Sequence, residues 1–295
     1  MPTYEHAGFT FDYDDSHITD SHSTDSHSTD SGFGGAESET VVLLHGFPQS
    51  RRSWNRVTPL LVDAGYRVLA LDQRGYSPGA RPRRRRDYTI ELLTGDVLAL
   101  ADAVGVDRFH VVGHDWGGAV AWSLGANHSN RVATMTSLAT PHPKAMLSAM
   151  TSSNQALMSW YMVAFQVPGV PEWMVTNGLA SGRFVETLVE SGLPATEAAA
   201  NVEMLRNGAA RGAFNWYRAL PFNKPSAVGD VSVPTLYVYG DDDLALGVRA
   251  AELTADHVSG EYRYERLRGA DHWLPETSSD EVSTLVIELL EKHPI

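Results

Sequence analysis

Residues 111–118 read VVGHDWGG and place one acidic residue in a glycine-rich turn. An apolar run precedes this turn and a helix-forming stretch follows it. The pattern G-x-nucleophile-x-G between a strand and a helix is typical of a nucleophile turn, and Asp115 occupies the position of the nucleophile. The free N–H groups at the start of the following helix would stabilise negative charge there. Taken alone, a G-x-D-x-G string also occurs by chance, and Asp is a common helix cap.

A carboxylate in this position restricts the reaction. A carboxylate that attacks a saturated carbon forms an ester, and water can then hydrolyse this ester at the enzyme's own carbonyl carbon. A serine attacking the same carbon would form an ether, which water does not easily cleave. Asp115 therefore predicts a substrate that carries an electrophilic saturated carbon with a leaving group, such as an epoxide or an alkyl halide.

A second candidate segment is HGFP at residues 45–48, directly after the short apolar run at 41–44. A turn there would aim the backbone N–H of Phe47 at the site as one half of an oxyanion hole. The N–H of Trp116, next to the nucleophile, would supply the other half. An ordinary loop between a strand and a helix would have the same composition.

Alternating strands and helices are predicted on both sides of the nucleophile turn. This alternation is typical of an α/β protein with a mostly parallel sheet flanked by helices. Between residues 141 and 222 it stops, and helical stretches rich in Met, Trp and Ala predict an inserted helical lid. The predicted strands are 41–44, 66–71, 109–115, 132–138, 235–239 and 261–267, after a hairpin at 4–13. The predicted helices outside the lid are 54–64, 90–104, 116–128, 248–257 and 279–291.

The composition limits the class of protein. The chain has 295 residues, of which 43% are hydrophobic, enough for one large α/β domain. A net charge of −13 argues against a nucleic-acid partner. The chain contains no cysteine, no signal peptide is recognisable, and no stretch approaches the ~18 apolar residues of a membrane span. We therefore expect a cytoplasmic protein; the oligomeric state cannot be read from the sequence.

One low-complexity segment interrupts this pattern. Residues 16–30 read SHITD, SHSTD and SHSTD, and a glycine-rich stretch follows. Because such a composition cannot bury apolar surface, residues 16–36 are expected to form a disordered loop. His17, His22 and His27 could bind a metal weakly, but their spacing implies no fixed tetrahedral ligand set, so no metal site is expected.

The order HGFP, DQRGYS, GHDWGG, a late acid and a C-terminal histidine resembles the α/β-hydrolase fold. The Asp nucleophile resembles the branch of this superfamily that contains epoxide hydrolases and haloalkane dehalogenases. Two further stretches resemble the epoxide hydrolases, YMVAFQVPG from Tyr161 and NWYR around Tyr217. The resemblance implies an α/β-hydrolase core over 1–140 and 226–295, a lid over 141–225, and no cofactor.

The resemblance also implies a triad in the chain order nucleophile, acid, histidine. The family pattern G-x-x-D selects Asp243 as the acid, with Asp242 as the alternative and Asp241 as a turn residue. His272, in GADHW after the last predicted strand, is the expected base. Four more residues are expected to support the site: His45, Gly46, Pro48 and His114.

In the implied mechanism, Tyr161 and Tyr217 hydrogen-bond the epoxide oxygen while Asp115 opens the ring, and His272 then activates water to release a diol. The apolar side chains of the predicted lid favour an apolar or aromatic epoxide. The partners implied are therefore a small epoxide and water.

Two alternatives stay open. A haloalkane or haloacid dehalogenase would use the same Asp-His-Asp triad, with Trp116 as a halide donor. Against it, haloalkane dehalogenases usually carry Gln at the position of His114, and Trp116 and Ala119 replace the Arg pair of fluoroacetate dehalogenases. The second alternative is a small-molecule binding protein that kept the fold and lost turnover.

Overall fold

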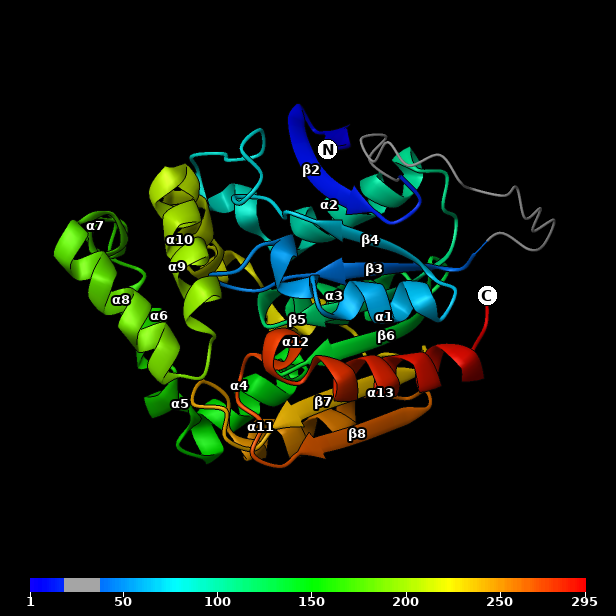
Figure 1. Cartoon of the computed structure of the whole chain (residues 1–295). Helices are drawn as coiled ribbons and strands as arrows, with labels where there is room; N and C mark the ends of the chain where they lie inside the picture. The colour runs from blue at the N-terminus through cyan, green and yellow to red at the C-terminus, as the bar shows by residue number, and fades with distance from the viewer. Residues whose placement is uncertain (19–37) are drawn as a thin grey trace.

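The computed structural model of the chain describes residues 1–18 and 38–295 (Figure 1). Within them, eight strands form a sheet in the order β1-β2-β4-β3-β5-β6-β7-β8. β1 and β2 form an antiparallel hairpin, β2 pairs antiparallel with β4, and all later neighbours are parallel, as predicted. The strands are β1 (Thr3–His6), β2 (Phe9–Asp15), β3 (Thr40–Leu44), β4 (Arg67–Leu71), β5 (Phe109–His114), β6 (Val132–Leu138), β7 (Thr235–Gly240) and β8 (Tyr262–Leu267).

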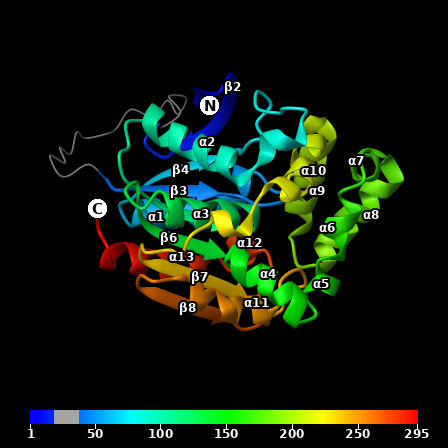
Figure 2. The ribbon, with the colours of Figure 1, turned by 180° about the vertical axis from the view of Figure 1, so that it is seen from behind.

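Helices cover both faces of this sheet, with α1 and α13 on the side nearer the viewer in Figure 1 and α2 and α3 on the side nearer the viewer in Figure 2. This two-sided cover is the reason that the central strands are continuously apolar. The helices outside the lid region are α1 (Val57–Asp63), α2 (Ile90–Ala103), α3 (Trp116–Asn127), α11 (Val248–Leu253), α12 (Leu274–Thr277) and α13 (Ser279–Lys292).

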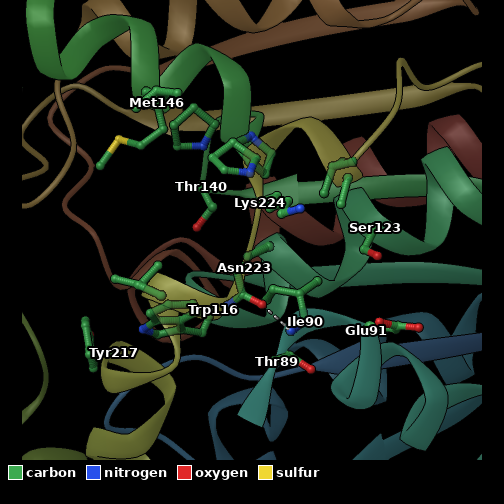
Figure 3. A pocket seen from close by; sticks show the side chains of 18 of the residues that line it. Thr89, Ile90, Glu91, Trp116, Ser123, Thr140, Met146, Tyr217, Asn223 and Lys224 are labelled. Atoms are coloured by element: carbon green, nitrogen blue, oxygen red, sulfur yellow. Dashed lines mark hydrogen bonds between the residues drawn. The ribbon is translucent and has the colours of Figure 1, made fainter. Parts of the chain in front are cut away.

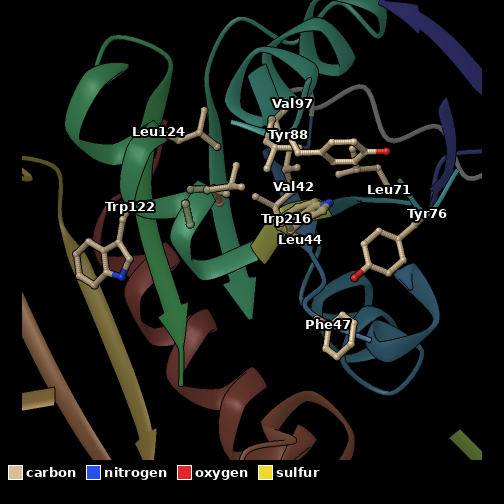
Figure 4. Close-up of a cluster of buried hydrophobic side chains, with 14 of the residues drawn as sticks. Val42, Leu44, Phe47, Leu71, Tyr76, Tyr88, Val97, Trp122, Leu124 and Trp216 are labelled. Atoms are coloured by element: carbon tan, nitrogen blue, oxygen red, sulfur yellow. The ribbon is translucent and has the colours of Figure 1, made fainter. Parts of the chain in front are cut away.

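The side chains of each central strand alternate between two hydrophobic cores. In β3, Val42 and Leu44 join the cluster that contains residues of α2 and α3 (Figure 4), whereas Val41 and Leu43 join the cluster beneath α1 and α13. Alternate residues of a strand point to opposite faces, so one strand supplies both cores. The packing fixes β3 and β5 at the centre of the sheet, and the loops that follow them carry two of the predicted site segments.

Seven helices lie in the segment predicted as the lid, and those from α6 to α10 stand beyond the carboxyl ends of the parallel strands (Figures 1 and 2). The boundaries proposed for core and lid stay a prediction. These helices are α4 (Pro143–Ser152), α5 (Gln155–Met158), α6 (Trp160–Ala164), α7 (Val170–Thr176), α8 (Gly178–Glu190), α9 (Ala195–Met204) and α10 (Ala210–Arg218).

Most ends of the predicted elements agree with the observed ones to within two residues, and three of the differences have a local cause. The helix predicted from residue 54 begins at Val57, which puts Pro59 in the first turn, where a missing N–H is tolerated. The helix predicted over 248–257 ends at Leu253 and continues as a 3₁₀ turn. The central strand ends at His114 because Asp115 has a positive φ. The predicted loop over 16–36 lies outside the described residues from position 19 onward, as do His22 and His27.

Candidate active site

Asp115 lies in the sharp turn between β5 and α3. Its backbone adopts φ 49° and ψ −119°, an unusual conformation for a residue other than glycine. The two glycines of the motif make this turn possible, because a Cβ on Gly113 would lie 2.1 Å from the carbonyl oxygen of Gly117. Thr140 donates a hydrogen bond of 2.6 Å to the backbone oxygen of Asp115. The turn therefore holds the Asp115 side chain at the carboxyl end of the sheet.

The HGFP segment contacts this carboxylate directly. The backbone N–H of Phe47 donates a hydrogen bond of 2.8 Å to Asp115 Oδ1. A Cβ on Gly46 would lie 2.4 Å from Cβ of Asp115, so only glycine fits there. The peptide bond between Phe47 and Pro48 is cis. The structure thus brings Phe47 to the nucleophile, while the backbone N–H of Trp116, the first residue of α3, stays a predicted second donor.

His272 connects two carboxylates. Its Nδ1 lies 2.7 Å from Asp243 Oδ2, and its Nε2 lies 3.7 Å from Asp115 Oδ2. The other oxygen of Asp243 accepts hydrogen bonds of 2.7 and 2.9 Å from the backbone N–H groups of Ala245 and Leu246, so this carboxylate is fixed on both sides. The arrangement orients the imidazole with Nε2 toward the nucleophile.

Of the three candidate acids, Asp243 is the one that contacts His272. Asp242 is exposed, and Asp241 accepts a hydrogen bond of 2.6 Å from the N–H of Gly269, which ties the turn after β7 to the loop after β8. The chosen position therefore matches the geometry of a triad acid.

The charges of the triad depend on one another. Burial by itself raises the pKa of Asp115, but the His272 imidazole and the Phe47 N–H hold it below its ordinary value. Burial alone lowers the pKa of His272, whereas the Asp243 and Asp115 carboxylates raise it well above its ordinary value. The site therefore keeps Asp115 ionised, as its predicted role as nucleophile requires, with an imidazolium beside it.

His45 supports the loop that carries Phe47. Its Nε2 accepts a hydrogen bond of 3.1 Å from the N–H of Gln73, and its Nδ1 lies 2.9 Å from the carbonyl oxygen of Gly46. Burial lowers the pKa of His45 to about 4, so the ring is neutral with its proton on Nδ1. His45 thereby joins the loops that follow β3 and β4.

His114 is the centre of a buried hydrogen-bonded chain behind the triad. Its Nε2 lies 2.8 Å from the carbonyl oxygen of His272, and its Nδ1 lies 2.8 Å from Gln49 Oε1. Gln49 Nε2 donates a hydrogen bond of 2.6 Å to Glu276 Oε1. Burial lowers the pKa of His114 to about 4, so the neutral ring carries one N–H and donates to one of these two oxygens. Burial raises the pKa of Glu276 to about 8. The chain contacts the backbone of His272; the supporting role of His114 stays a prediction.

The sequence reasoning missed Gln49 and Glu276. Gln49 could have been found, because it directly follows the HGFP segment. Glu276 had no such signal, since it lies in a short helix far along the chain and reaches Gln49 only in the folded structure.

The two lid tyrosines meet above the nucleophile turn. Tyr161, in α6, and Tyr217, in α10, have ring centroids 6.1 Å apart in an edge-to-face arrangement, and the ring of Tyr217 lies 5.0 Å from that of Trp116. Burial, followed by the nearby Asp115 carboxylate, raises the pKa of both phenols well above the ordinary value. Both side chains therefore stay protonated and can donate hydrogen bonds.

The two lid strings found in the sequence bind each other. Gln166 donates a hydrogen bond of 2.8 Å to the carbonyl oxygen of Tyr217, and Arg218 donates one of 2.9 Å to the carbonyl oxygen of Phe165. Arg218 also forms an ion pair with Glu172 in α7. These contacts explain why residues near each tyrosine are part of the pattern, because they dock α6 and α7 onto α10.

A cavity of about 780 Å³ opens next to Asp115 (Figure 3). Tyr161, Tyr217 and Trp116 line it near the nucleophile, together with Met146 and other apolar side chains. This volume is that of a small-molecule site. Among the described residues, no group of three or more His, Asp or Glu side chains is arranged to hold a metal ion. In the same part of the chain, no helix is both long enough and apolar enough to cross a membrane.

Comparisons with known proteins agree with this geometry. Residues 39–169 match the family model of the alpha/beta hydrolase fold. Epoxide hydrolase A of Mycobacterium tuberculosis is 34% identical, over 85% of this chain and 89% of its own length. Epoxide hydrolase 3 of Xenopus tropicalis is 31% identical, over 88% of this chain and 73% of its own length. The crystal structure of epoxide hydrolase A from Mycobacterium thermoresistibile superposes with a TM-score of 0.79 at 25% identity, covering 100% of this chain and 98% of that one. The chain belongs to the epoxide hydrolase family of the α/β-hydrolase fold.

Proposed function

We propose that this chain is an enzyme that hydrolyses an apolar or aromatic epoxide to a vicinal diol, through a covalent ester on Asp115. The observation that carries the proposal is an ionised carboxylate in a strained turn, facing two protonated tyrosines across an apolar cavity. A carboxylate that opens the ring and phenols that protonate its oxygen are the two partners that this reaction needs. The proposed reactants are the epoxide and water; a cytoplasmic location is still an expectation from the sequence alone.

In the first step, Asp115 attacks one ring carbon and the carbon–oxygen bond to that carbon breaks. The alkoxide takes a phenolic proton from Tyr161 or Tyr217. Ester formation removes the negative charge of Asp115, which lowers the pKa of His272 toward the value set by Asp243 alone. His272 then gives up its proton, which returns the tyrosine phenolate to a phenol. A neutral imidazole is left beside the ester.

In the second step, His272 takes a proton from water, and the water oxygen adds to the ester carbonyl of Asp115. The N–H of Phe47, and the predicted N–H of Trp116, stabilise the negative oxygen, a contribution typically worth about 3 kcal/mol per donor. The alkoxy oxygen leaves with the remaining proton of that water. The diol is released, and the carboxylate and imidazolium of the free enzyme are regenerated.

The test is diol formation from styrene oxide by the wild type and by the double variant Tyr161→Phe/Tyr217→Phe. We expect diol from the wild type and a loss of at least 100-fold in kcat/KM for the variant, because two general-acid groups are removed. Circular dichroism of the variant checks that it is folded. Equal rates in both proteins would contradict the role of the tyrosines. Halide release from an alkyl halide, with no diol from a panel of epoxides, would favour the dehalogenase alternative.

A further inference from the structure

One segment singled out in the sequence, DQRGYS at residues 72–77, has no part in the proposed reaction, although it directly follows β4. In the structure this loop lies between the HGFP segment and α10. The backbone N–H of Gln73 donates a hydrogen bond of 3.1 Å to Nε2 of His45 in the HGFP segment. The next residue, Arg74, accepts a hydrogen bond from α10. Two neighbouring residues of the loop therefore connect the nucleophile side of the site with the helix that carries Tyr217.

The loop and α10 touch backbone to backbone. Gly75 has a φ of 96°, and a Cβ on Gly212 in α10 would lie 2.4 Å from Cα of Gly75. Any side chain at position 212 would therefore push the helix away from the loop. The loop itself is tight, because the N–H of Gly75 donates a hydrogen bond of 2.7 Å to the carbonyl oxygen of Ala80. Two glycines thus set the distance between α10 and the loop after β4.

The buried side chain of Trp216 fixes the rotation of α10 on this loop. Its indole Nε1 donates a hydrogen bond of 2.8 Å to the carbonyl oxygen of Arg74. Trp216 lies four residues after Gly212, so both residues face the loop from one side of the helix. The indole ring lies 6.1 Å from the ring of Tyr76 (Figure 4) and 5.7 Å from that of Trp116, which follows the nucleophile. The indole is therefore held by a hydrogen bond and by two aromatic rings.

The residue that accepts this hydrogen bond is itself fixed in the core. The guanidinium of Arg74 donates two hydrogen bonds, of 2.7 and 2.6 Å, to the carboxylate of Asp96 in α2. Both side chains are only 3% exposed, and Arg74 donates a third hydrogen bond of 3.0 Å to the carbonyl oxygen of Asp87. A planar guanidinium that is bound at three nitrogens has little freedom to move. The acceptor for Trp216 therefore has a fixed position relative to the sheet.

Tyr217 directly follows Trp216 in α10. Successive side chains of a helix point about 100° apart, so a helix that places Trp216 on the loop leaves one direction for Tyr217. In that direction Tyr217 lines the cavity next to Asp115. Its ring lies 5.0 Å from the ring of Trp116 and 5.2 Å from that of Phe47. A general acid has to lie within hydrogen-bond reach of the accepting oxygen, so a small rotation of α10 would remove the phenol from its place.

We propose that Trp216 is a positioning residue for ring opening: its hydrogen bond to the Arg74 carbonyl aims the Tyr217 hydroxyl at the epoxide oxygen. This inference rests on the proposed function and adds to it a residue that acts through Tyr217. Trp216 affects the first step alone, because the second step uses His272 and not the tyrosine. Loss of the indole N–H should therefore slow the formation of the ester and leave its hydrolysis unchanged.

The test follows the ester formed from styrene oxide by rapid-quench mass spectrometry, in a His272→Gln background where the ester accumulates. Trp216→Phe keeps a buried ring but removes the donor, and it should lower the rate of ester formation by about tenfold or more. Trp54→Phe is the matched control, because Trp54 is fully buried and its Nε1 has no partner within the described part of the chain. This control should keep the rate within about twofold of the background.

Two further measurements separate positioning from a general loss of structure. When Tyr217→Phe is already present, adding Trp216→Phe should change the rate of ester formation by less than about twofold, because the group that Trp216 positions is gone. With His272 intact, Trp216→Phe should hydrolyse the ester at the wild-type rate. Circular dichroism checks the fold. If Trp216→Phe does not fold, Gly212→Ala, which presses α10 away from the loop, takes its place with the same expected results.

The outcomes distinguish this inference from the proposed function. An unchanged rate in Trp216→Phe, or an equal loss with and without Tyr217, would overturn the positioning role and leave the epoxide hydrolase proposal intact. No ester from styrene oxide or from a wider panel of epoxides, in any of these proteins, would contradict the proposed function. In that case, the nuclear Overhauser effect between the rings of Tyr217 and Trp116 decides the positioning role without a substrate. It should persist in Trp54→Phe and weaken in Trp216→Phe, and equal intensity in both variants would overturn the proposal.

Discussion

The nucleophile and the lid tyrosines face one cavity, but the two regions that carry them differ in how firmly they are held. Around the triad, Asp243 is fixed by three hydrogen bonds, and His272 is also held through its backbone by His114. In the lid, no residue of α6 is fully buried, and large apolar side chains of α6 and α8 are exposed, such as Trp160 at 69% and Leu179 at 89%. Regions with few buried contacts open at lower free-energy cost.

Within the lid, the two helices that carry the tyrosines also differ in burial. α10 is buried along most of its length and carries Tyr217, whereas α6, which carries Tyr161, has no fully buried residue. In the proposed mechanism, the groups that attack and are hydrolysed need fixed geometry, and they lie on the core. The proposed proton donor Tyr161 lies on a more weakly held helix, which suits a phenol that has to reach an oxygen that moves during the reaction.

The largest effect is expected from His272→Gln. Ring opening needs Asp115 and the tyrosines, whereas hydrolysis of the ester needs the base, so the variant should accumulate the ester and lose at least 10³-fold in turnover. The intact mass of the variant should increase by one substrate molecule after reaction with styrene oxide. Asp115→Asn is the control and should gain no mass. Normal turnover by His272→Gln would show that the core does not supply the base.

The buried carboxyl of Glu276 should make the free energy of unfolding depend on pH. Burial raises the pKa of Glu276 to about 8. Because the folded state then binds the proton more tightly than the unfolded state, the free energy of unfolding falls as pH rises from about 4 to 8. Glu276→Gln has no ionisable carboxyl at this position and therefore removes this loss. At pH 9, the free energy of unfolding of the variant should exceed that of the wild type by about 2–4 kcal/mol.

Urea denaturation at pH 5 and pH 9 measures this difference. Glu281→Gln, which changes an exposed carboxylate in α13, is the matched control and should follow the wild type at both pH values. If the free energy of unfolding of Glu276→Gln also equalled that of the wild type at both pH values, burial would not control the charge of Glu276.

The attachment of α7 to α10 should depend on Arg218. This guanidinium pairs with Glu172 and is nearly buried, so Arg218→Met leaves a half-buried carboxylate without its partner. We expect a cost of about 2–3 kcal/mol, seen as faster hydrogen exchange in α6 and α7 and a higher KM. Arg206→Met breaks the exposed ion pair with Glu203 and should cost under about 0.5 kcal/mol. Equal effects of the two changes would mean that the lid does not dock through this pair.

The smallest effect is expected from Leu179→Ser. This side chain is 89% exposed on α8, so its removal should change the free energy of unfolding by less than about 0.5 kcal/mol and leave kcat/KM unchanged. Leu188→Ser, on the same helix but buried, is the comparison and should destabilise the lid clearly. A large effect of Leu179→Ser would show that this face of α8 is covered in solution.

Much of the fold and of the candidate site followed from local patterns. Apolar runs predicted the central strands β3 to β7, because a strand buried on both faces must be continuously apolar. The glycines around Asp115 indicated the turn, since any larger residue would collide with the backbone. The choice of Asp243 over Asp242 came from the family pattern, and the hydrogen bond to His272 gives its physical basis.

Other features depend on contacts between distant segments. The chain from Glu276 through Gln49 to His114 joins residues that are far apart in the sequence, and nothing in the segment around Glu276 indicates this contact. The hydrogen bond from Trp216 to Arg74 likewise requires the packing of α10 on the loop after β4.

The sequence by itself determined which chemistry is available: an aspartate in a glycine turn, a late histidine and acid, and two tyrosines in recognisable strings. These depend on residue type and on spacing within one element, which a linear pattern records. Only the tertiary structure decided which residues line the cavity and which buried side chains contact His272. Those properties arise from the separation of surfaces that belong to different elements, and this separation is set by the packing of the whole core.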